Sequence, residues 1–164
     1  MLSRVADSLY WMSRYVKRTD SVLRLLKVNY ASAQDDAAFT WRPVLKIFTY
    51  LEDAEISRME KNTRMVLHYM IVEKDNPNAV ATLVTKAREN ARSVQDNITN
   101  ELWQTLNEFY HIVRDERLAL ALQTKDPITT LDMLIARAML YYGIAESTMF
   151  RGEGLNFMNI GKYL

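Results

Sequence analysis

The sequence of 164 residues contains no cysteine, and its four glycines all lie in the last 22 residues, at Gly143, Gly152, Gly154 and Gly161. Without cysteine the chain can form neither disulfides nor thiolate metal sites. P-loops, dinucleotide-binding turns and tight hairpins need glycine where the backbone takes a positive φ or approaches a phosphate. Glycine is missing from the first 142 residues, which argues against a nucleotide-binding α/β domain. We expect no cofactor.

Long apolar runs and an excess of one charge are also missing. The longest apolar run is about eight residues, MVLHYMIV at 65–72, whereas a membrane-spanning helix needs about twenty. Lys and Arg number 21 against 20 Asp and Glu, and a net charge of +1 suggests neither nucleic acid nor an acidic membrane as partner. Asp7 and Arg14 interrupt any apolar core of a signal peptide. We therefore expect a cytoplasmic protein with no nucleic-acid partner and no membrane partner.

What the sequence does contain is apolar residues at helical spacing. A composition of 49% hydrophobic and 25% charged residues fits one globular domain over 1–164. The first segment spaces its apolar residues by four and three in turn, at Val5, Leu9, Met12, Val16, Thr19, Leu23, Leu26 and Tyr30. Similar patterns and capping residues predict further helices over about 40–51, 56–72, 76–94, 100–122, 126–149 and 155–164. The predicted fold is an all-α bundle of six to seven amphipathic helices with no β-sheet.

The C-terminal segment repeats a string from the first helix. Gly161-Lys162-Tyr163-Leu164 aligns with Ser13-Arg14-Tyr15-Val16 as small, basic, aromatic and aliphatic residues. The chain also stops in the middle of an apolar period, without a capping residue. Two readings are open: an ordinary helix end, or a second copy of the first helix, truncated within the helix.

Four blocks of the sequence together resemble one protein family. They are MLSRVADSLYWMSRYVKR at 1–18, DNPNAV at 75–80, ARENARSVQDNITNELWQTLN at 87–107 and MFRGEGLNFMNIGKYL at 149–164. They resemble the bacterial alpha-E family, an all-helical family of unknown function with a Glu-Arg signature after the small, basic, aromatic, aliphatic string. The resemblance implies a protein about twice this long, of which this chain is the N-terminal half, and an association with ATP-grasp amide ligases and transglutaminase-like proteins.

The chain departs from the family where the signature is expected. Lys17-Arg18 follows the first string, so a base replaces the family's glutamate and the arginine is kept. The chain ends at Leu164 before a second pair could occur. Asp20 offers a carboxylate about one turn further along the helix.

Basic and aromatic residues form a second stripe on the first helix. At 100° per residue, the stripe lies nearly opposite the apolar seam and contains Arg4, Asp7, Trp11, Arg14 and Arg18. One interpretation is packing, with Trp11 under another helix and the arginines paired to acids. The other is an anion site in which Trp11, Arg14 and Arg18 hold a carboxylate or phosphate.

The helix predicted over 76–94 carries a related cluster. Arg88 and Arg92 are one turn apart, and Glu89 lies three residues before Arg92, a spacing typical of surface ion pairs. If this helix packs on the first one, the four arginines could share one basic pocket with Glu89 as the counter-charge. Trp103 and Asn107 would then be candidates for its wall.

Two enzyme motifs are incomplete. Glu108-x-x-His111 has the spacing of a di-iron ligand pair, but a second copy is needed and His68 has Met65 in place of the acid. No Ser or Thr lies three or four residues before either histidine, where the two side chains could meet on one helix. We expect no metal site, and no catalytic residue can be assigned.

Three functions remain open. The first is an accessory binding protein of an amide-ligase system, which presents a helical surface to a partner enzyme or to its peptide-like substrate. The second is a catalytic component of such a system whose active site is completed by the missing C-terminal half of the longer protein. The third is a structural helical oligomer. We also expect self-association, because a two-part helical protein cut at Leu164 should expose apolar surface that its other half normally covers.

Overall fold

The computed structural model describes residues 1–164, which form nine α-helices, one short 3₁₀ helix and no strand. The prediction of an all-α fold is therefore confirmed, but the predicted number of helices is wrong. The helices are α1 (Ser3–Asp35), α2 (Arg42–Phe48), α3 (Asp53–Met59), α4 (Thr63–Ile71), α5 (Val80–Ser93), α6 (Asn100–Arg114), α7 (Glu116–Thr124), α8 (Pro127–Thr148) and α9 (Glu153–Tyr163).

Two of the predicted helices are each broken in two by a capping residue. The segment 56–72 is divided between α3 and α4, where the Asn62 side chain accepts a hydrogen bond from Met65 N at 3.1 Å. The segment 100–122 is divided between α6 and α7, where Asp115 accepts from Arg117 N at 2.9 Å. Short polar side chains bind free amide groups at a helix start, so one such residue can begin a new helix although the apolar pattern continues.

The predicted helix start at Asn76 and Pro77 is also wrong. The helix α5 begins only at Val80. Asn76 is fully buried and holds the preceding loop, since its Nδ2 donates to Tyr69 O at 3.0 Å and its Oδ1 accepts from Asn78 N at 3.1 Å. An Asn side chain can stabilise a turn or cap a helix, and Asn76 stabilises the turn before α5.

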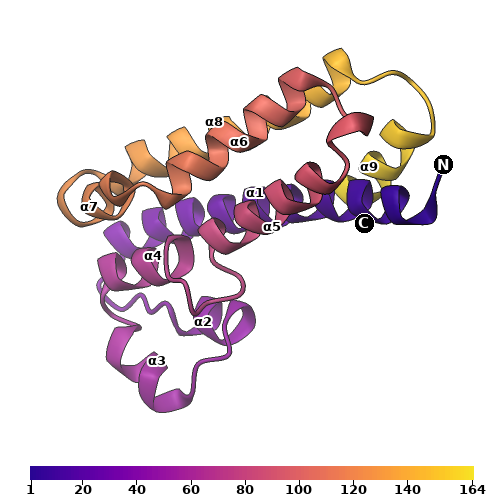
Figure 1. The fold of residues 1–164 in the computed structure, drawn as a ribbon. Coiled ribbons are helices and arrows are strands. Elements are labelled where there is room, and N and C mark those ends of the chain that lie inside the picture. Colours follow the sequence, from indigo (N-terminus) through magenta and orange to yellow (C-terminus); the bar gives the residue numbers. More distant parts are fainter.

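The long helix α1 is the centre of the fold. Figure 1 shows α5 and α8 along it, α6 packed on α5 and α8, and α9 against its first turns, close to both termini. The predicted seam is confirmed, because six of its residues have no exposed surface: Leu9, Met12, Val16, Thr19, Leu23 and Leu26. All of them except Thr19 belong to one continuous core of 35 buried hydrophobic residues. Burial of this single core explains why the helices form one unit.

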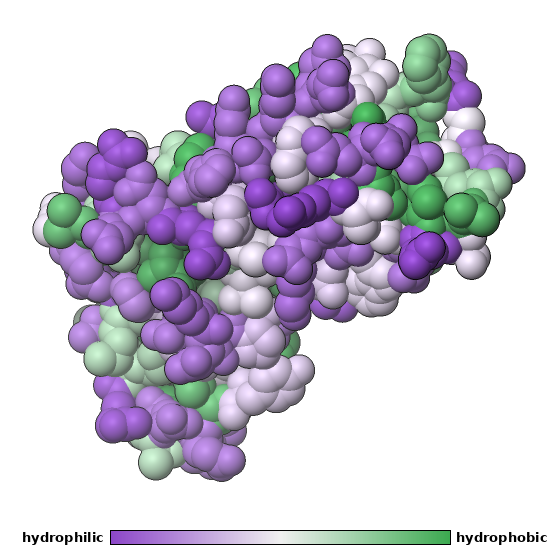
Figure 2. Space-filling view, viewed as in Figure 1, coloured by the Kyte–Doolittle hydropathy of each residue, from purple (hydrophilic) through white to green (hydrophobic).

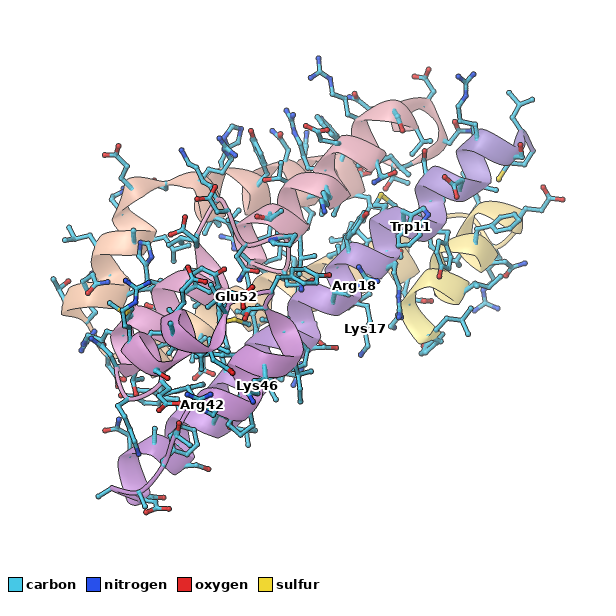
Figure 3. The ribbon with its side chains drawn as sticks, turned by 90° about the horizontal axis from the view of Figure 1, so that it is seen from below. Trp11, Lys17, Arg18, Arg42, Lys46 and Glu52 are labelled. Carbon is cyan, nitrogen blue, oxygen red and sulfur yellow. The ribbon has the colours of Figure 1, made fainter.

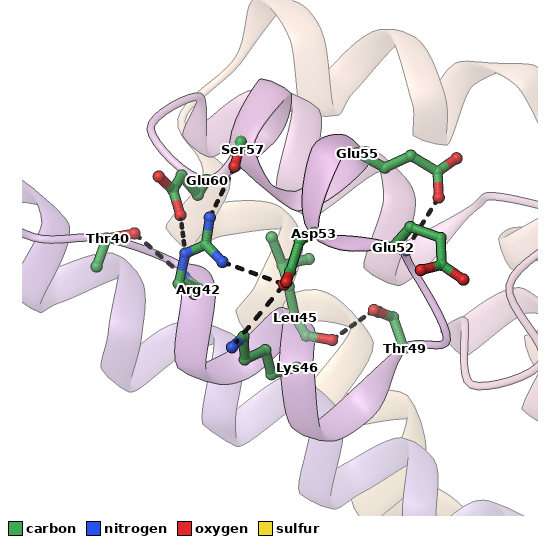
Figure 4. A network of polar contacts seen from close by, with 10 residues as sticks. All are labelled: Thr40, Arg42, Leu45, Lys46, Thr49, Glu52, Asp53, Glu55, Ser57 and Glu60. Carbon is green, nitrogen blue, oxygen red and sulfur yellow. Dashed lines mark hydrogen bonds and ion pairs between the residues drawn. The ribbon is translucent and has the colours of Figure 1, made fainter.

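The short helices α2 and α3 are fastened to each other by Arg42 (Figure 4). Its Nε donates to Glu60 at 2.6 Å, its Nη2 donates to Ser57 at 2.8 Å, and its Nη1 lies 3.4 Å from Asp53. All three guanidinium nitrogens thus have a partner within the chain. This arginine is a structural tie between two helices, and it shows what a satisfied arginine looks like in this fold.

No membrane-spanning helix was expected from the sequence, but α8 passes a test of length and composition for one. It is the one helix long and apolar enough to cross a membrane by length and composition, with a mean hydropathy of 1.2. It also supplies Leu131, Leu134, Ala138 and Tyr141 to the core. A core helix passes the same test of length and composition, and 39% of the apolar window of α8 is buried inside the protein.

Candidate anion-binding groove

A groove with a basic lining lies where α1, α9 and the start of α5 meet. It encloses about 280 Å³ and is lined by Arg14, Lys17, Arg18, Ser21, Val22, Phe48, Asn78, Leu83, Lys162, Tyr163 and Leu164. Four of these side chains are cationic, and none of the eleven side chains is acidic. Figure 3 shows Lys17 and Arg18 on the part of α1 that lies beside α9.

Three of the four cations have no anionic partner in the chain. Arg14, Arg18 and Lys162 form no ion pair, and Lys17 approaches only Asp20, at 3.9 Å. Arg42, by contrast, has partners for all three of its guanidinium nitrogens. Like charges repel when they are brought together, so a groove that holds them without acids is complementary to an anion.

Two similar strings of sequence build this groove. Ser13-Arg14-Tyr15-Val16 lies on α1 and Gly161-Lys162-Tyr163-Leu164 on α9, and the basic residue of each string lines the groove. The contact depends on Gly161, because a Cβ atom there would collide with Tyr10 O and lie 3.1 Å from Tyr10 C. The small residue of the second string therefore lets the two helix backbones approach closely enough to bring Arg14 and Lys162 to one site.

The small residue of the first string has its own contact. Ser13 is buried, and its Oγ shares a 2.8 Å hydrogen bond with the hydroxyl of Tyr141 on α8. Burial raises the pKa of Tyr141 above its ordinary value, although the Ser13 hydrogen bond lowers it in part. The hydroxyl therefore stays protonated at physiological pH and holds α1 to α8.

Trp11 stacks next to the groove rather than lining it. Its ring centroid lies 5.5 Å from that of Tyr15, and the Arg18 guanidinium lies 5.9 Å from Trp11 and 6.0 Å from Tyr15. Lys86 of α5 lies 5.7 Å from the Tyr15 ring. The aromatic pair thus supports Arg18 from one side, and this contact leaves the hydrogen-bonding edge of the guanidinium without a partner in the chain.

The candidate site residues on α5 and α6 do not line the groove. The Arg88 guanidinium lies 4.6 Å from the Tyr110 ring and 5.3 Å from Trp103, and its Nε donates to Asn107 at 3.2 Å. Arg88 therefore belongs to the contact between α5 and α6. Arg92 and Glu89 are exposed and form no ion pair. The structure brings Arg14 and Arg18 to one groove and places Arg88 and Arg92 outside it.

Two further groups lie near the groove without lining it. Asp20 is buried and pairs with Arg24 at 2.9 Å, so Arg24 partly neutralises its charge. The Tyr142 hydroxyl is buried without a hydrogen-bond partner, and Lys162 Nζ lies 4.6 Å from its ring. Burial, and then the nearby Tyr141, Asp20 and Tyr163, raise the pKa of Tyr142. This phenol therefore stays neutral and adds no negative charge beside the cations.

The lining determines what the groove can do chemically. It offers guanidinium and ammonium donors to an anion, and it has no carboxylate, imidazole or thiol side chain. No group of three or more His, Asp or Glu side chains in the structure could hold a metal ion. This lining is complementary to an anionic group.

The whole chain matches a known protein family. Residues 1–164 match the model of the Alpha-E family, described as a predicted alpha-helical domain with a conserved ER motif. The chain belongs to the Alpha-E family. The resemblance seen in the four sequence blocks is therefore confirmed. The Lys17-Arg18 pair, in the groove, occupies the place that the resemblance gives to the Glu-Arg pair.

Relatives of this Alpha-E chain include two uncharacterized proteins, one of Mycobacterium bovis and one of Mycobacterium tuberculosis. Each is 26% identical over 182 residues, an alignment that covers 97% of this chain and 20% of the relative. The chain thus spans about a fifth of the length of the curated relatives it matches. No solved structure matches the chain.

Sequence reasoning missed part of the groove. Lys162 had a signal, because it stands in the repeated string at the position of Arg14, but nothing in the sequence says that the two strings pack together. Phe48 ends α2 and Asn78 lies in the loop before α5, and neither belongs to a periodic pattern. Long-range packing brings these two residues to the groove, so their positions could be found only from the fold.

Proposed function

We propose that this Alpha-E domain is an accessory binding protein of an ATP-grasp amide-ligase and transglutaminase-like peptide-modification system, and that its groove binds a carboxylate or phosphate of that system. The observation that supports the proposal is the set of four cations, Arg14, Lys17, Arg18 and Lys162, in a groove with no acidic side chain. The association with amide ligases comes from the family resemblance, and an amide ligase joins a carboxylate to an amine, so an anionic group belongs to such a system. A helical domain with a basic groove fits such chemistry as a holder of the substrate or intermediate.

The anion-binding part of the proposal is tested with simple anions. We expect calorimetric titration to show binding of inorganic phosphate and acetate at millimolar concentration. Replacing both Arg14 and Arg18 with Gln keeps the side-chain stems and removes two charges, so the affinity should fall at least tenfold while the melting temperature changes by only a few degrees. No binding to the parent protein would contradict the proposal.

A matched control removes two charges outside the groove. Arg4 and Arg92 are exposed and form no ion pair, so Arg4→Gln combined with Arg92→Gln changes the net charge by the same amount. We expect this control to bind the anions like the parent. An equal loss in both double variants would show that the anions respond to overall charge and not to the groove.

The partner part of the proposal has a separate test. A purified ATP-grasp ligase from the same organism is mixed with the domain, and sedimentation velocity is used to detect a complex. We expect a complex with the parent protein that weakens with the Arg14→Gln, Arg18→Gln variant. If the groove binds anions but no complex forms, the result contradicts the accessory role and supports the anion site.

A further inference from the structure

The groove has an apolar side as well as a cationic one. Val22 of α1 and Leu83 of α5 are buried, and Phe48 at the end of α2 is half-buried. Leu83 and Phe48 line the groove from α5 and α2, and Val22 lies on α1 beside the cations. Of the three, Phe48 keeps exposed surface, so a bare phosphate or acetate would leave Phe48 in water, whereas a ligand with an apolar side chain would cover it.

Asn78 is a polar residue of the lining whose side-chain orientation is defined. Asn78 Nδ2 donates to Phe48 O at 2.9 Å, which assigns the amide nitrogen to that contact. The Asn78 side-chain oxygen then has no partner in the chain, and a carbonyl oxygen accepts hydrogen bonds only. A ligand that satisfies it carries an N–H or O–H donor, which acetate lacks. An acylated amino acid supplies such a donor in its amide N–H.

From these three features we infer that the groove binds the carboxylate of an apolar amino-acid residue whose nitrogen is acylated. The carboxylate pairs with Arg14, Arg18 and Lys162, the side chain covers Phe48, and the amide N–H donates to Asn78. This inference rests on the proposed function, because it names the ligand class of the same groove. A peptide C-terminus and a free N-acyl amino acid both carry this chemistry.

The size of the groove agrees with a single residue. Its volume of about 280 Å³ lies just below the range of about 300–1,000 Å³ typical of pockets for drug-sized ligands. A long acyl chain or a nucleotide would extend well beyond it. One apolar residue with its carboxylate and acyl group is the ligand that uses all three features.

Four small probes separate the features, each titrated calorimetrically into the parent protein. N-acetyl-L-leucine carries all three features, 4-methylpentanoate lacks the N–H, N-acetyl-L-leucinamide lacks the charge, and acetate lacks the side chain and the N–H. We expect N-acetyl-L-leucine to bind at least tenfold more tightly than acetate, 4-methylpentanoate to lie between them, and the amide not to bind. Equal affinity for acetate and N-acetyl-L-leucine would overturn the inference and leave the anion site intact. No binding of any probe would overturn both.

Variants place the probes in the groove. In Arg14→Gln, Arg18→Gln, binding of every charged probe should weaken at least tenfold. In Phe48→Ala, only the preference for N-acetyl-L-leucine over acetate should shrink. An unchanged preference in a folded Phe48→Ala protein would overturn the apolar contact, and if that variant does not fold, the probe series on the parent protein still decides.

A comparison of two ligands distinguishes a peptide C-terminus from a free acylated amino acid. Acetyl-Gly-Gly-Leu carries the same terminal residue on a peptide. A higher affinity for this peptide than for N-acetyl-L-leucine assigns the groove to peptide C-termini, and an equal affinity assigns it to acylated amino acids of either origin. A peptide that binds at least tenfold more weakly than N-acetyl-L-leucine would contradict binding of a peptide C-terminus.

Discussion

At the scale of single residues, the groove is distinguished by cations that the chain itself does not neutralise. Arg42 and Arg117 show the alternative, since each pairs with an acid of its own neighbourhood. Arg14, Arg18 and Lys162 have aromatic or backbone neighbours but no acid. An anion that binds in the groove would reduce the repulsion between these cations.

Lys17 is the residue where this chain departs from the family, and it provides a charge-reversal test. Lys17→Glu would place an acid in the groove, so we predict that the affinity for acetate and phosphate falls at least tenfold in titration calorimetry. Stability should fall modestly, because the new carboxylate lies three residues before the buried Asp20, which Lys17 approaches at 3.9 Å.

Lys17→Gln serves as the control for Lys17→Glu. It removes the cation without adding an acid and should lower the affinity by a smaller factor. Tighter anion binding in Lys17→Glu would contradict the assignment of Lys17 to the ligand side of the groove.

At the scale of helices, the groove depends on the close contact between α1 and α9. The contact is made through Gly161, and the lining residues Arg14 and Lys162 are its immediate neighbours. The packing of α9 therefore controls both the stability of this part of the fold and the geometry of the site. Helix-helix contacts made through a glycine tolerate no added methyl group when the facing atoms are backbone.

We predict that Gly161→Ala lowers the free energy of unfolding by about 1–3 kcal/mol, because overpacking forces the helices apart. Its added Cβ would collide with Tyr10 O and lie 3.2 Å from Arg14 N. Gly143→Ala is the matched control, since nothing lies within 4 Å of that position inside α8. There the change should stabilise the helix by about 0.5–1 kcal/mol. Urea unfolding measures both, and a neutral Gly161→Ala would contradict the close contact.

The cap of α7 gives a pH-dependent prediction. Hydrogen bonds from the Arg117 side chain and backbone lower the pKa of Asp115 from 3.8 to about 2. Because the folded pKa is below the unfolded one, Asp115 contributes stability above about pH 4, and this contribution disappears as the pH falls to about 2. We predict that Asp115→Ala unfolds at lower urea concentration than the parent at pH 7, and that the difference shrinks as the pH falls through about 2. A difference as large at pH 2 as at pH 7 would contradict this role.

The outcome at the level of elements shows what a sequence pattern can determine. The seam of α1 and the cap of α8 at Asp126 were predictable, because a long apolar period and an Asp-Pro pair at a helix start act locally. The breaks at Asn62 and Asp115 were not predicted, since the apolar period continues across them. Arg14 and Arg18 were found in the sequence because they share a helix face, whereas Phe48 and Asn78 reach the groove through long-range packing.

At the scale of the whole molecule, apolar residues are exposed at one end. Met1 is 56% exposed, Leu2 72% and Phe150 92%. Figure 2 shows that the face toward the viewer is mainly hydrophilic, and that hydrophobic residues gather near the end that holds the N-terminus. Exposed apolar surface of this kind commonly binds another protein surface.

We therefore expect self-association through this end of the molecule. Sedimentation equilibrium should show a dimer that forms with rising concentration, and Phe150→Ser should weaken it without lowering the melting temperature, because Phe150 is almost fully exposed. Leu120→Ser, at a 62% exposed position on α7, is the control and should leave the dimer intact. A stable monomer at concentrations far above micromolar would contradict the expectation.

The most direct test of the groove is an NMR titration of the ¹⁵N-labelled protein with N-acetyl-L-leucine. We predict that the amide signals that shift belong mainly to residues in and beside the groove, among them Arg14, Arg18, Asn78 and Lys162, and that Arg14→Gln, Arg18→Gln abolishes these shifts. The α5–α6 contact around Arg88 and Trp103 should not respond. Shifts centred on Arg88, or no shifts at millimolar ligand, would contradict a ligand site between α1 and α9.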